Sequence, residues 1–199
     1  PMRHPTPVLA LLATLALPAL LTAQSAQRWS VQGSILNVST SGDAYEGLDA
    51  GLGVEAQVRY TPSAFSIGAG YQRSSHDLTF DDGSTETVTL SGVFAEPRYV
   101  IDVGSGSYAP YLAGRVAFLT QKIAFEGLEA SASGTQLNVG GGVLVRLSPR
   151  VNLDLGATYG AIDFDDVKVE FEGQSATIDG SSGSGKNLVL RAGVTVGLR

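Results

Sequence analysis

The chain has 199 residues, enough for one domain and little more, and a formal net charge of −6. This acidic balance argues against nucleic acid as a partner, because binding to phosphate backbones depends on Lys and Arg. The absence of cysteine excludes disulfides, a lipid-modified cysteine anchor and thiolate metal or redox sites.

The first segment has the organisation of an export signal. Arg3 belongs to a short basic region, an apolar stretch follows, and small residues around Ala23 form a cleavage site. Cleavage after Ala26 and a retained helical anchor are the alternatives. We therefore expect a cleaved signal peptide over residues 1–23 and a single domain over residues 24–199.

Beyond this segment, apolar residues alternate with polar residues or glycine at a period of two, which is typical of β-strands. Residues 48–60 alternate without an exception. This run is long for a soluble strand of about 5–6 residues and suits a tilted membrane-spanning strand, which needs about 9–11. The same pattern predicts eight strands, in chain order about 28–40, 48–60, 65–72, 87–101, 109–123, 136–147, 152–159 and 188–199.

The predicted connections alternate in length. Short turns are expected at 61–63, 102–108 and 148–150, and longer polar loops at 41–47, 76–86, 124–135 and 165–187. Most of the acidic residues fall in the long loops, where Lys168 and Lys186 are the only basic ones. Short periplasmic turns and long outer loops are typical of outer-membrane barrels. The pattern predicts an all-β fold, an eight-stranded antiparallel up-and-down transmembrane β-barrel with acidic extracellular loops.

The polar face of the predicted strands carries charges of both signs, interleaved with glycines. Inside a narrow barrel the glycines leave room for long side chains, and buried charges must be paired. We therefore expect a luminal ion-pair network and a lipid-facing aliphatic surface; the network residues are Glu55, Arg59, Glu96, Arg98, Arg115, Arg146, Asp154 and Arg191. Aromatic residues expected at the membrane interface are Trp29, Tyr60, Tyr99 and Tyr111. A soluble lipocalin-like carrier, with the apolar face inward, is the alternative.

Two local sequences carry a resemblance to a known family. Glu96-Pro97-Arg98-Tyr99 on the fourth predicted strand and Ala109-Pro110-Tyr111-Leu112-Ala113-Gly114 on the fifth accompany glycine-rich repeats. With these features the chain resembles the small eight-stranded OmpA-like and OmpX-like outer-membrane proteins, the outer-membrane protein β-barrel domain family. The resemblance implies a monomer in the bacterial outer membrane, in contact with membrane lipid and lipopolysaccharide and inserted by the barrel assembly machinery. Such barrels usually end in an aromatic residue, whereas this chain ends in Leu198-Arg199.

Candidate catalytic chemistry centres on His76, which lies in Ser74-Ser75-His76-Asp77 at the start of a predicted loop. Some barrels of this size resemble enzymes that act on lipid A with a histidine, a serine and an acidic partner. Adjacent residues of an extended segment point to opposite faces, and the His-x-Ser-Asn pattern of lipid A deacylases is missing. We therefore predict a solvated loop histidine and no catalytic residue.

The acidic loops contain oxygen ligands of the kind that Ca²⁺ takes, but without the EF-hand spacing. No metal site and no cofactor are therefore predicted. Diffuse divalent cations between these loops and lipopolysaccharide phosphates are a hypothesis. The sequence favours a structural or interaction protein of the cell envelope with a plugged, charged lumen. A lipid A-modifying enzyme and a narrow gated pore are the alternatives.

Overall fold

The computed structural model describes residues 27–42, 45–80, 83–125, 128–165, 167–171, 174–178 and 183–198, most of them in β-strands. Within these residues no helix is both long and apolar enough to cross a membrane. The expected signal peptide, residues 1–23, and both candidate cleavage sites lie outside the described residues.

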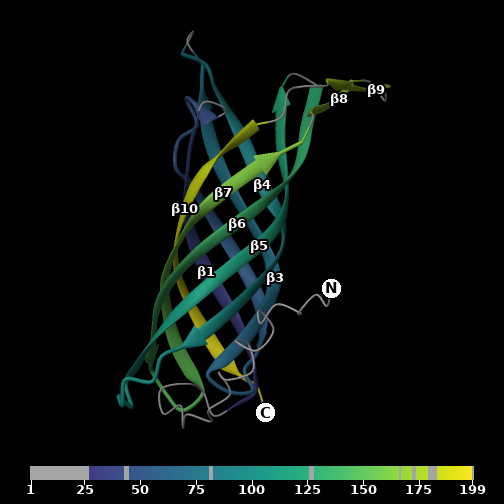
Figure 1. The fold of residues 1–199 in the computed structure, drawn as a ribbon. Coiled ribbons are helices and arrows are strands. Elements are labelled where there is room, and N and C mark those ends of the chain that lie inside the picture. Colours follow the sequence, from purple (N-terminus) through teal and green to yellow (C-terminus); the bar gives the residue numbers. More distant parts are fainter. Residues whose placement is uncertain are drawn as a thin grey trace, which may run out of the picture.

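Eight antiparallel strands close into a barrel (Figure 1). They are β1 (Trp29–Ser41), β2 (Gly51–Tyr60), β3 (Phe65–Thr79), β4 (Thr85–Val100), β5 (Tyr108–Phe125), β6 (Leu128–Arg146), β7 (Val151–Phe164) and β10 (Gly183–Gly197). The sheet closes where β1 pairs with β10, with Ser30 opposite Gly197. The first and last strands therefore begin and finish at the same end of the barrel, and the predicted eight-stranded antiparallel fold is confirmed.

The two ends of the barrel differ. The turn end carries the short connections at 61–64, 101–107 and 147–150, close to the predicted turns. The loop end carries the remaining connections and a hairpin of two further strands, β8 (Val167–Phe171) and β9 (Gln174–Ile178), which pairs with the start of β6.

The long loops predicted at the loop end are in large part strands. The β3–β4 ladder continues to Thr79 opposite Thr85, and the β5–β6 ladder continues to Phe125 opposite Leu128. The predictions for 76–86 and 124–135 were wrong for most of their length. Outward side chains become polar there, so the apolar alternation fades, while the backbone continues to exchange hydrogen bonds between neighbouring strands.

The outward face of the barrel is apolar through its middle. Ile35, Leu52 and Val139 are among the most exposed large apolar side chains, at 67%, 75% and 68%. Toward the loop end the outward positions turn polar, as at Arg73, which follows Tyr71 on the outer face of β3. This apolar band is the surface that a transmembrane barrel presents to lipid. The strand ends beyond it stand outside the hydrocarbon region.

The band predicts a depth-dependent effect of charge on β6. We expect Val139→Arg to lower the free energy of unfolding in lipid vesicles by about 2–4 kcal/mol, because it places a cation near the middle of the bilayer. Ser133→Arg is the matched control, since Ser133 is exposed on the same face of β6 beyond the band. Urea titration of both variants checks this expectation, and equal effects would contradict a lipid-facing surface.

Candidate functional site

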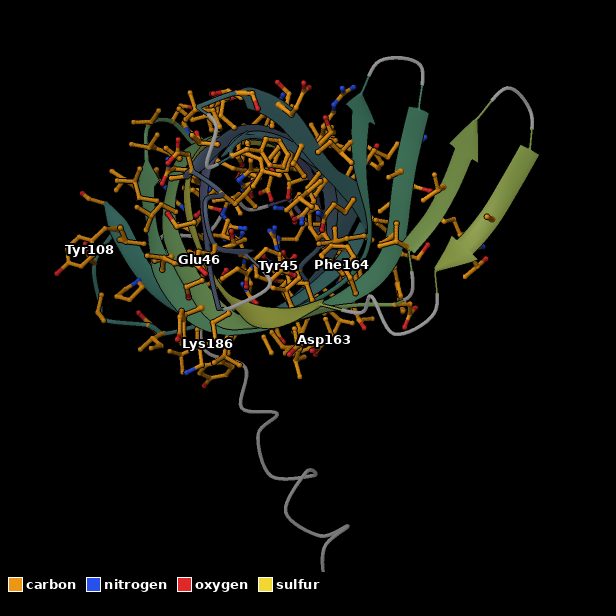
Figure 2. The ribbon with its side chains drawn as sticks, turned by 90° about the horizontal axis from the view of Figure 1, so that it is seen from above. Tyr45, Glu46, Tyr108, Asp163, Phe164 and Lys186 are labelled. Carbon is orange, nitrogen blue, oxygen red and sulfur yellow. The ribbon has the colours of Figure 1, made fainter. Side chains whose placement is uncertain are left out.

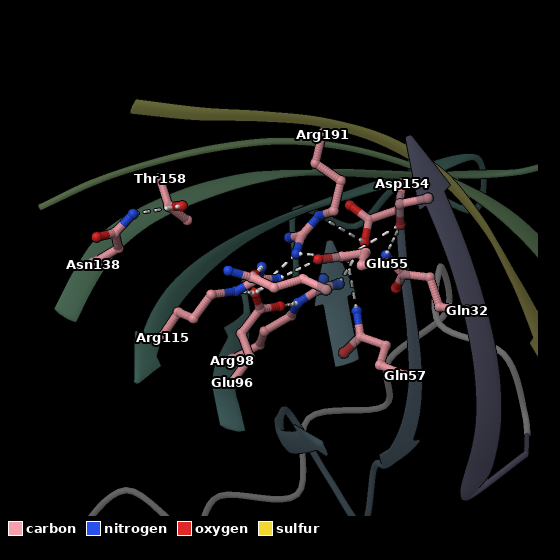
Figure 3. Close-up of polar contacts among 12 residues, drawn as sticks. Gln32, Glu55, Gln57, Glu96, Arg98, Arg115, Asn138, Asp154, Thr158 and Arg191 are labelled. Atoms are coloured by element: carbon pink, nitrogen blue, oxygen red, sulfur yellow. Dashed lines mark hydrogen bonds and ion pairs between the residues drawn. The ribbon is translucent and has the colours of Figure 1, made fainter. Parts of the chain in front are cut away.

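The middle of the lumen is crossed by buried charged side chains, which we call the luminal ion cluster (Figure 3). Its members come from five strands and are nearly inaccessible: Glu55 and Arg59 on β2, Glu96 and Arg98 on β4, Arg115 on β5, Asp154 on β7 and Arg191 on β10. Strand alternation places each of them inward, and closure of the barrel brings the five strands around one axis.

Glu96 is the centre of the luminal ion cluster. Its Oε1 accepts hydrogen bonds from Arg59 Nη2 at 2.9 Å and from Arg98 Nε at 2.6 Å. Its Oε2 accepts from Arg115 Nε at 2.8 Å and from Arg191 Nη1 at 2.8 Å. One fully buried carboxylate therefore joins four arginines. Charge-assisted hydrogen bonds of this kind are stronger than neutral ones.

The other two carboxylates complete the arrangement. Glu55 Oε2 lies 2.8 Å from Arg115 Nη2, and Glu55 Oε1 lies 3.3 Å from Arg191 Nη1. Asp154 Oδ2 accepts from Arg98 Nη1 at 2.7 Å. The cluster as a whole thus links the two halves of the barrel wall across the lumen.

Tyr111 belongs to this cluster and not to the membrane interface. It is 2% exposed, donates its hydroxyl proton to Asp154 Oδ1 at 2.6 Å, and its ring lies 4.4 Å from the Arg98 guanidinium carbon. A Cβ atom at Gly142 or Gly156 would lie 2.5 Å from the Tyr111 hydroxyl, so the tyrosine fits only because both positions are glycine. The interfacial prediction for Tyr111 was wrong. Tyr111 shares the strand parity of Arg115, which was the available signal that it points inward.

The remaining predicted residues lie toward the turn end. Trp29 and Tyr99 are exposed, at 52% and 43%. The rings of Trp29 and Tyr60 are in tilted contact, with their centroids 4.8 Å apart. Their role at a membrane interface stays a prediction. Arg146 is half-buried at the end of β6, where its backbone N–H donates to the Ser107 carbonyl, and it lies away from the middle of the lumen.

Toward the loop end the lumen is filled by apolar side chains, which we call the loop-end apolar cluster (Figure 2). Its members are Tyr45, Leu90, Phe94, Ala117, Leu119, Ala132, Ile162 and Phe164. Tyr45 comes from the β1–β2 connection and is 6% exposed. Burial, with a smaller contribution from the Asp163 carboxylate, raises the pKa of Tyr45 to about 12. A Cβ at Gly185 would lie 2.5 Å from its ring. Tyr45 could not be found from the sequence, because a single aromatic residue in a short polar loop has no periodic signal.

His76 is buried on the inner face of β3, 1% exposed, so its prediction as a solvated loop residue was wrong. Its Nε2 lies 3.0 Å from Ser74 Oγ, and its Nδ1 lies 3.1 Å from the Asp49 carbonyl oxygen. Because the carbonyl only accepts, Nδ1 carries the proton, and Ser74 donates to Nε2. Ser74 and His76 are two residues apart and share the inner face of β3. Among the described residues no group of three potential metal ligands comes together.

The comparisons with known proteins agree with this architecture. The family model for the outer membrane protein beta-barrel domain matches residues 8–196. The chain belongs to this family. The predicted resemblance and the location in the bacterial outer membrane, in contact with its lipid and lipopolysaccharide, are thereby confirmed.

Solved barrels of this family's architecture are similar to the chain at low sequence identity. Neisserial surface protein A (NspA) has a TM-score of 0.65 at 20% identity, with 85% of this chain and 97% of that chain covered. OprG from Pseudomonas aeruginosa has a TM-score of 0.57 at 12% identity, covering 88% and 98%. A major outer membrane protein from Thermus thermophilus has a TM-score of 0.54 at 17% identity, covering 86% and 98%. No curated protein matches the sequence. These likenesses show the fold alone.

The central position of Glu96 predicts a large effect of removing its charge. We expect Glu96→Gln to lower the free energy of unfolding by about 3–5 kcal/mol, because four buried guanidinium groups would then face two carboxylates. The free energy of unfolding is measured by urea titration in detergent micelles, in which the folded fraction is read from the mobility shift of the folded barrel on gels. The control is Asp102→Asn in an exposed turn, which keeps the oxygen that accepts from the Gly104 N–H. Similar midpoints for both variants would show that the cluster contributes little to stability.

His76 predicts a dependence of stability on pH. It lies beyond the apolar band, and burial lowers its pKa below the ordinary 6.5, although the Asp49 carbonyl and Asp77 act in the opposite direction. The unfolded chain therefore takes up a proton on acidification before the folded chain does. This stabilisation is present above about pH 6.5 and is lost as the pH falls toward the pKa of the folded state.

We therefore expect His76→Asn, which retains an N–H donor for the Asp49 carbonyl, to have a smaller loss of stability between about pH 7.5 and about pH 5.5 than the unchanged protein. Urea midpoints of both proteins at the two pH values give the comparison. An identical pH dependence would show that His76 titrates alike in the folded and unfolded states.

Proposed function

We propose that this outer-membrane barrel is a non-conducting structural and interaction protein of the cell envelope, inserted by the barrel assembly machinery as a monomer. The observation that carries the proposal is the filling of the lumen at two levels. The luminal ion cluster crosses the middle, and the loop-end apolar cluster occupies the outer half. Two cavities between the inward side chains measure about 30 Å³ and about 10 Å³, room for little more than single waters.

The loop end is the surface that we propose for interaction. We place it outside the cell because longer connections face outward in barrels of this kind. Five of its described acidic side chains are exposed around the mouth: Glu46, Asp49, Asp77, Asp163 and Asp165. Carboxylates in this number suit divalent cations, which would bridge them to the phosphates of surrounding lipopolysaccharide. The surface would then hold the barrel within its lipid layer.

One contact favours the enzymatic alternative. The Ser74–His76 pair, with the Asp49 carbonyl beside Nδ1, has the order of a nucleophile, a base and an orienting group. Both side chains point into the lumen and are buried, however, so the acyl chains of a membrane lipid do not reach them. The contact fits a role in holding the β1–β2 connection better than a role in lipid hydrolysis.

A filled lumen predicts the absence of large steady conductance. We expect the unchanged protein in planar lipid bilayers to show no sustained open steps. The double variant Glu96→Ala and Arg115→Ala, which removes both partners of a central pair, should produce small ones. Asp102→Asn, a variant with an unchanged lumen, is the control and should show no sustained open steps. Large steady steps from the unchanged protein would support the pore alternative and overturn the closed barrel.

The acidic loop end predicts lipopolysaccharide association that depends on divalent cations. We expect Mg²⁺ to increase, and EDTA to decrease, the lipopolysaccharide retained by the purified barrel. The triple variant Glu46→Gln, Asp163→Asn and Asp165→Asn should reduce the Mg²⁺-dependent fraction several-fold, because these side chains are exposed at the loop end. Asp102→Asn at the turn end should leave it unchanged. A triple variant with undiminished retention would exclude these carboxylates as the bridging surface.

A further inference from the structure

A small polar cavity lies at the turn end of the lumen, below the luminal ion cluster. It measures about 30 Å³, and the polar residues that define it include Ser30, Arg59, Ser66, Arg98, Asn152 and Thr195. All six are buried. The cavity is large enough for a halide ion or a water molecule and too small for sulfate or phosphate.

The luminal ion cluster above this cavity is not balanced in charge. Its four arginines face three carboxylates. An uncompensated charge inside a low-dielectric lumen is costly, so a counter-charge at the cavity would stabilise the folded barrel.

Two of the arginines that line this cavity have N–H groups without an acceptor in the described structure. Arg98 uses Nε and Nη1 on Glu96 and Asp154, while its Nη2 has no hydrogen-bond acceptor among the described residues. Arg59 uses Nη1 and Nη2, and its Nε likewise has no acceptor within the described part of the chain. These two side chains are 2% and 5% exposed. Both side chains line the cavity, so a small rotation of either guanidinium group would turn its unused N–H toward a space that already has excess positive charge beside it.

The neighbouring polar groups suit the same ligand. Ser66 Oγ accepts from Arg59 Nη1, so its own proton is available to donate. The Asn152 amide oxygen has no hydrogen-bond partner in the described structure, and rotation of the amide would present its NH₂ group to the cavity instead. Two guanidinium groups, a hydroxyl and an amide at the same cavity can therefore supply donors after small adjustments of these side chains.

We propose that this cavity binds a single small monovalent anion of the size of chloride, which completes the charge balance of the luminal ion cluster. The anion enters at the turn end, where Gln27 and Thr61 also line the cavity. It would act as a structural counter-ion, holding Arg59 and Arg98 in the positions from which they bind Glu96.

The first test is the anion dependence of stability. The urea midpoint of the purified barrel is measured in gluconate, sulfate, chloride and bromide at constant ionic strength. We expect the midpoint to rise and saturate with chloride and with bromide, and to show no saturating rise with gluconate or sulfate, whose general salt effects grow steadily with concentration. A midpoint with no saturating response specific to chloride and bromide would overturn the proposal, because general salt effects would then explain the data.

The second test supplies the missing charge covalently. Asn152→Asp places a carboxylate on the cavity wall at nearly unchanged size, and we expect its midpoint to lose the chloride dependence. Asn138→Asp is the matched control, since Asn138 is an equally buried luminal amide that does not line this cavity, and the chloride dependence should persist. Undiminished chloride dependence in Asn152→Asp would place the anion elsewhere and overturn the proposal.

A direct measurement does not depend on either variant folding well. Crystals of the unchanged protein grown in bromide should give an anomalous peak between Arg59 and Arg98. Density without anomalous signal at that point would identify water in the cavity and would refute the anion site.

Discussion

The structure depends on one constraint of the hydrocarbon region, where no water can pair with a backbone N–H or C=O group. A sheet satisfies this constraint only when it closes on itself. Here closure is made by twelve pairs of residues between β1 and β10, the two ends of the folded chain. Once eight strands close, the lumen has a fixed and narrow width. The inward side chains of opposite strands are therefore in contact with one another.

The luminal ion cluster is the consequence of that narrow width. A wider barrel would leave water between its charges, whereas here Arg59, Arg115 and Arg191 all reach the one carboxylate of Glu96. Small residues of the wall make the arrangement possible, as at Gly68, where a Cβ would lie 2.8 Å from Arg59 Nη2. Glycine and arginine therefore act together: the first removes volume from the wall and the second fills the lumen.

The sequence predicted the middle of the barrel well because one physical rule operates there. Lipid on one side and a packed interior on the other enforce strict alternation, so strand number, topology and the inward position of Glu96 and Arg115 follow from parity. The same rule placed Tyr111 inward, but its aromatic character and its nearness to a strand end suggested the interface instead. Pairing distances between charges on different strands depend on register and tilt, which a single sequence does not contain.

The loop end was predicted less well because the rule changes beyond the membrane. Outward side chains are polar there, so alternation fades although the strands continue, and His76 was assigned to a loop for this reason. Tyr45 was missed altogether, since its burial depends on contacts with residues far along the chain, such as Phe164 and Gly185. Long-range packing of a single side chain has no local signature.

The burial of Tyr45 depends on closure of the barrel. The side chain belongs to the connection between the first two strands, but its surroundings include the last two, β7 and β10. Its binding place therefore does not exist until the final strand has joined the first. Burial of Tyr45 at the mouth therefore reports that the barrel has closed, because an intermediate in which β1 and β10 have not paired cannot bring all of these residues around it.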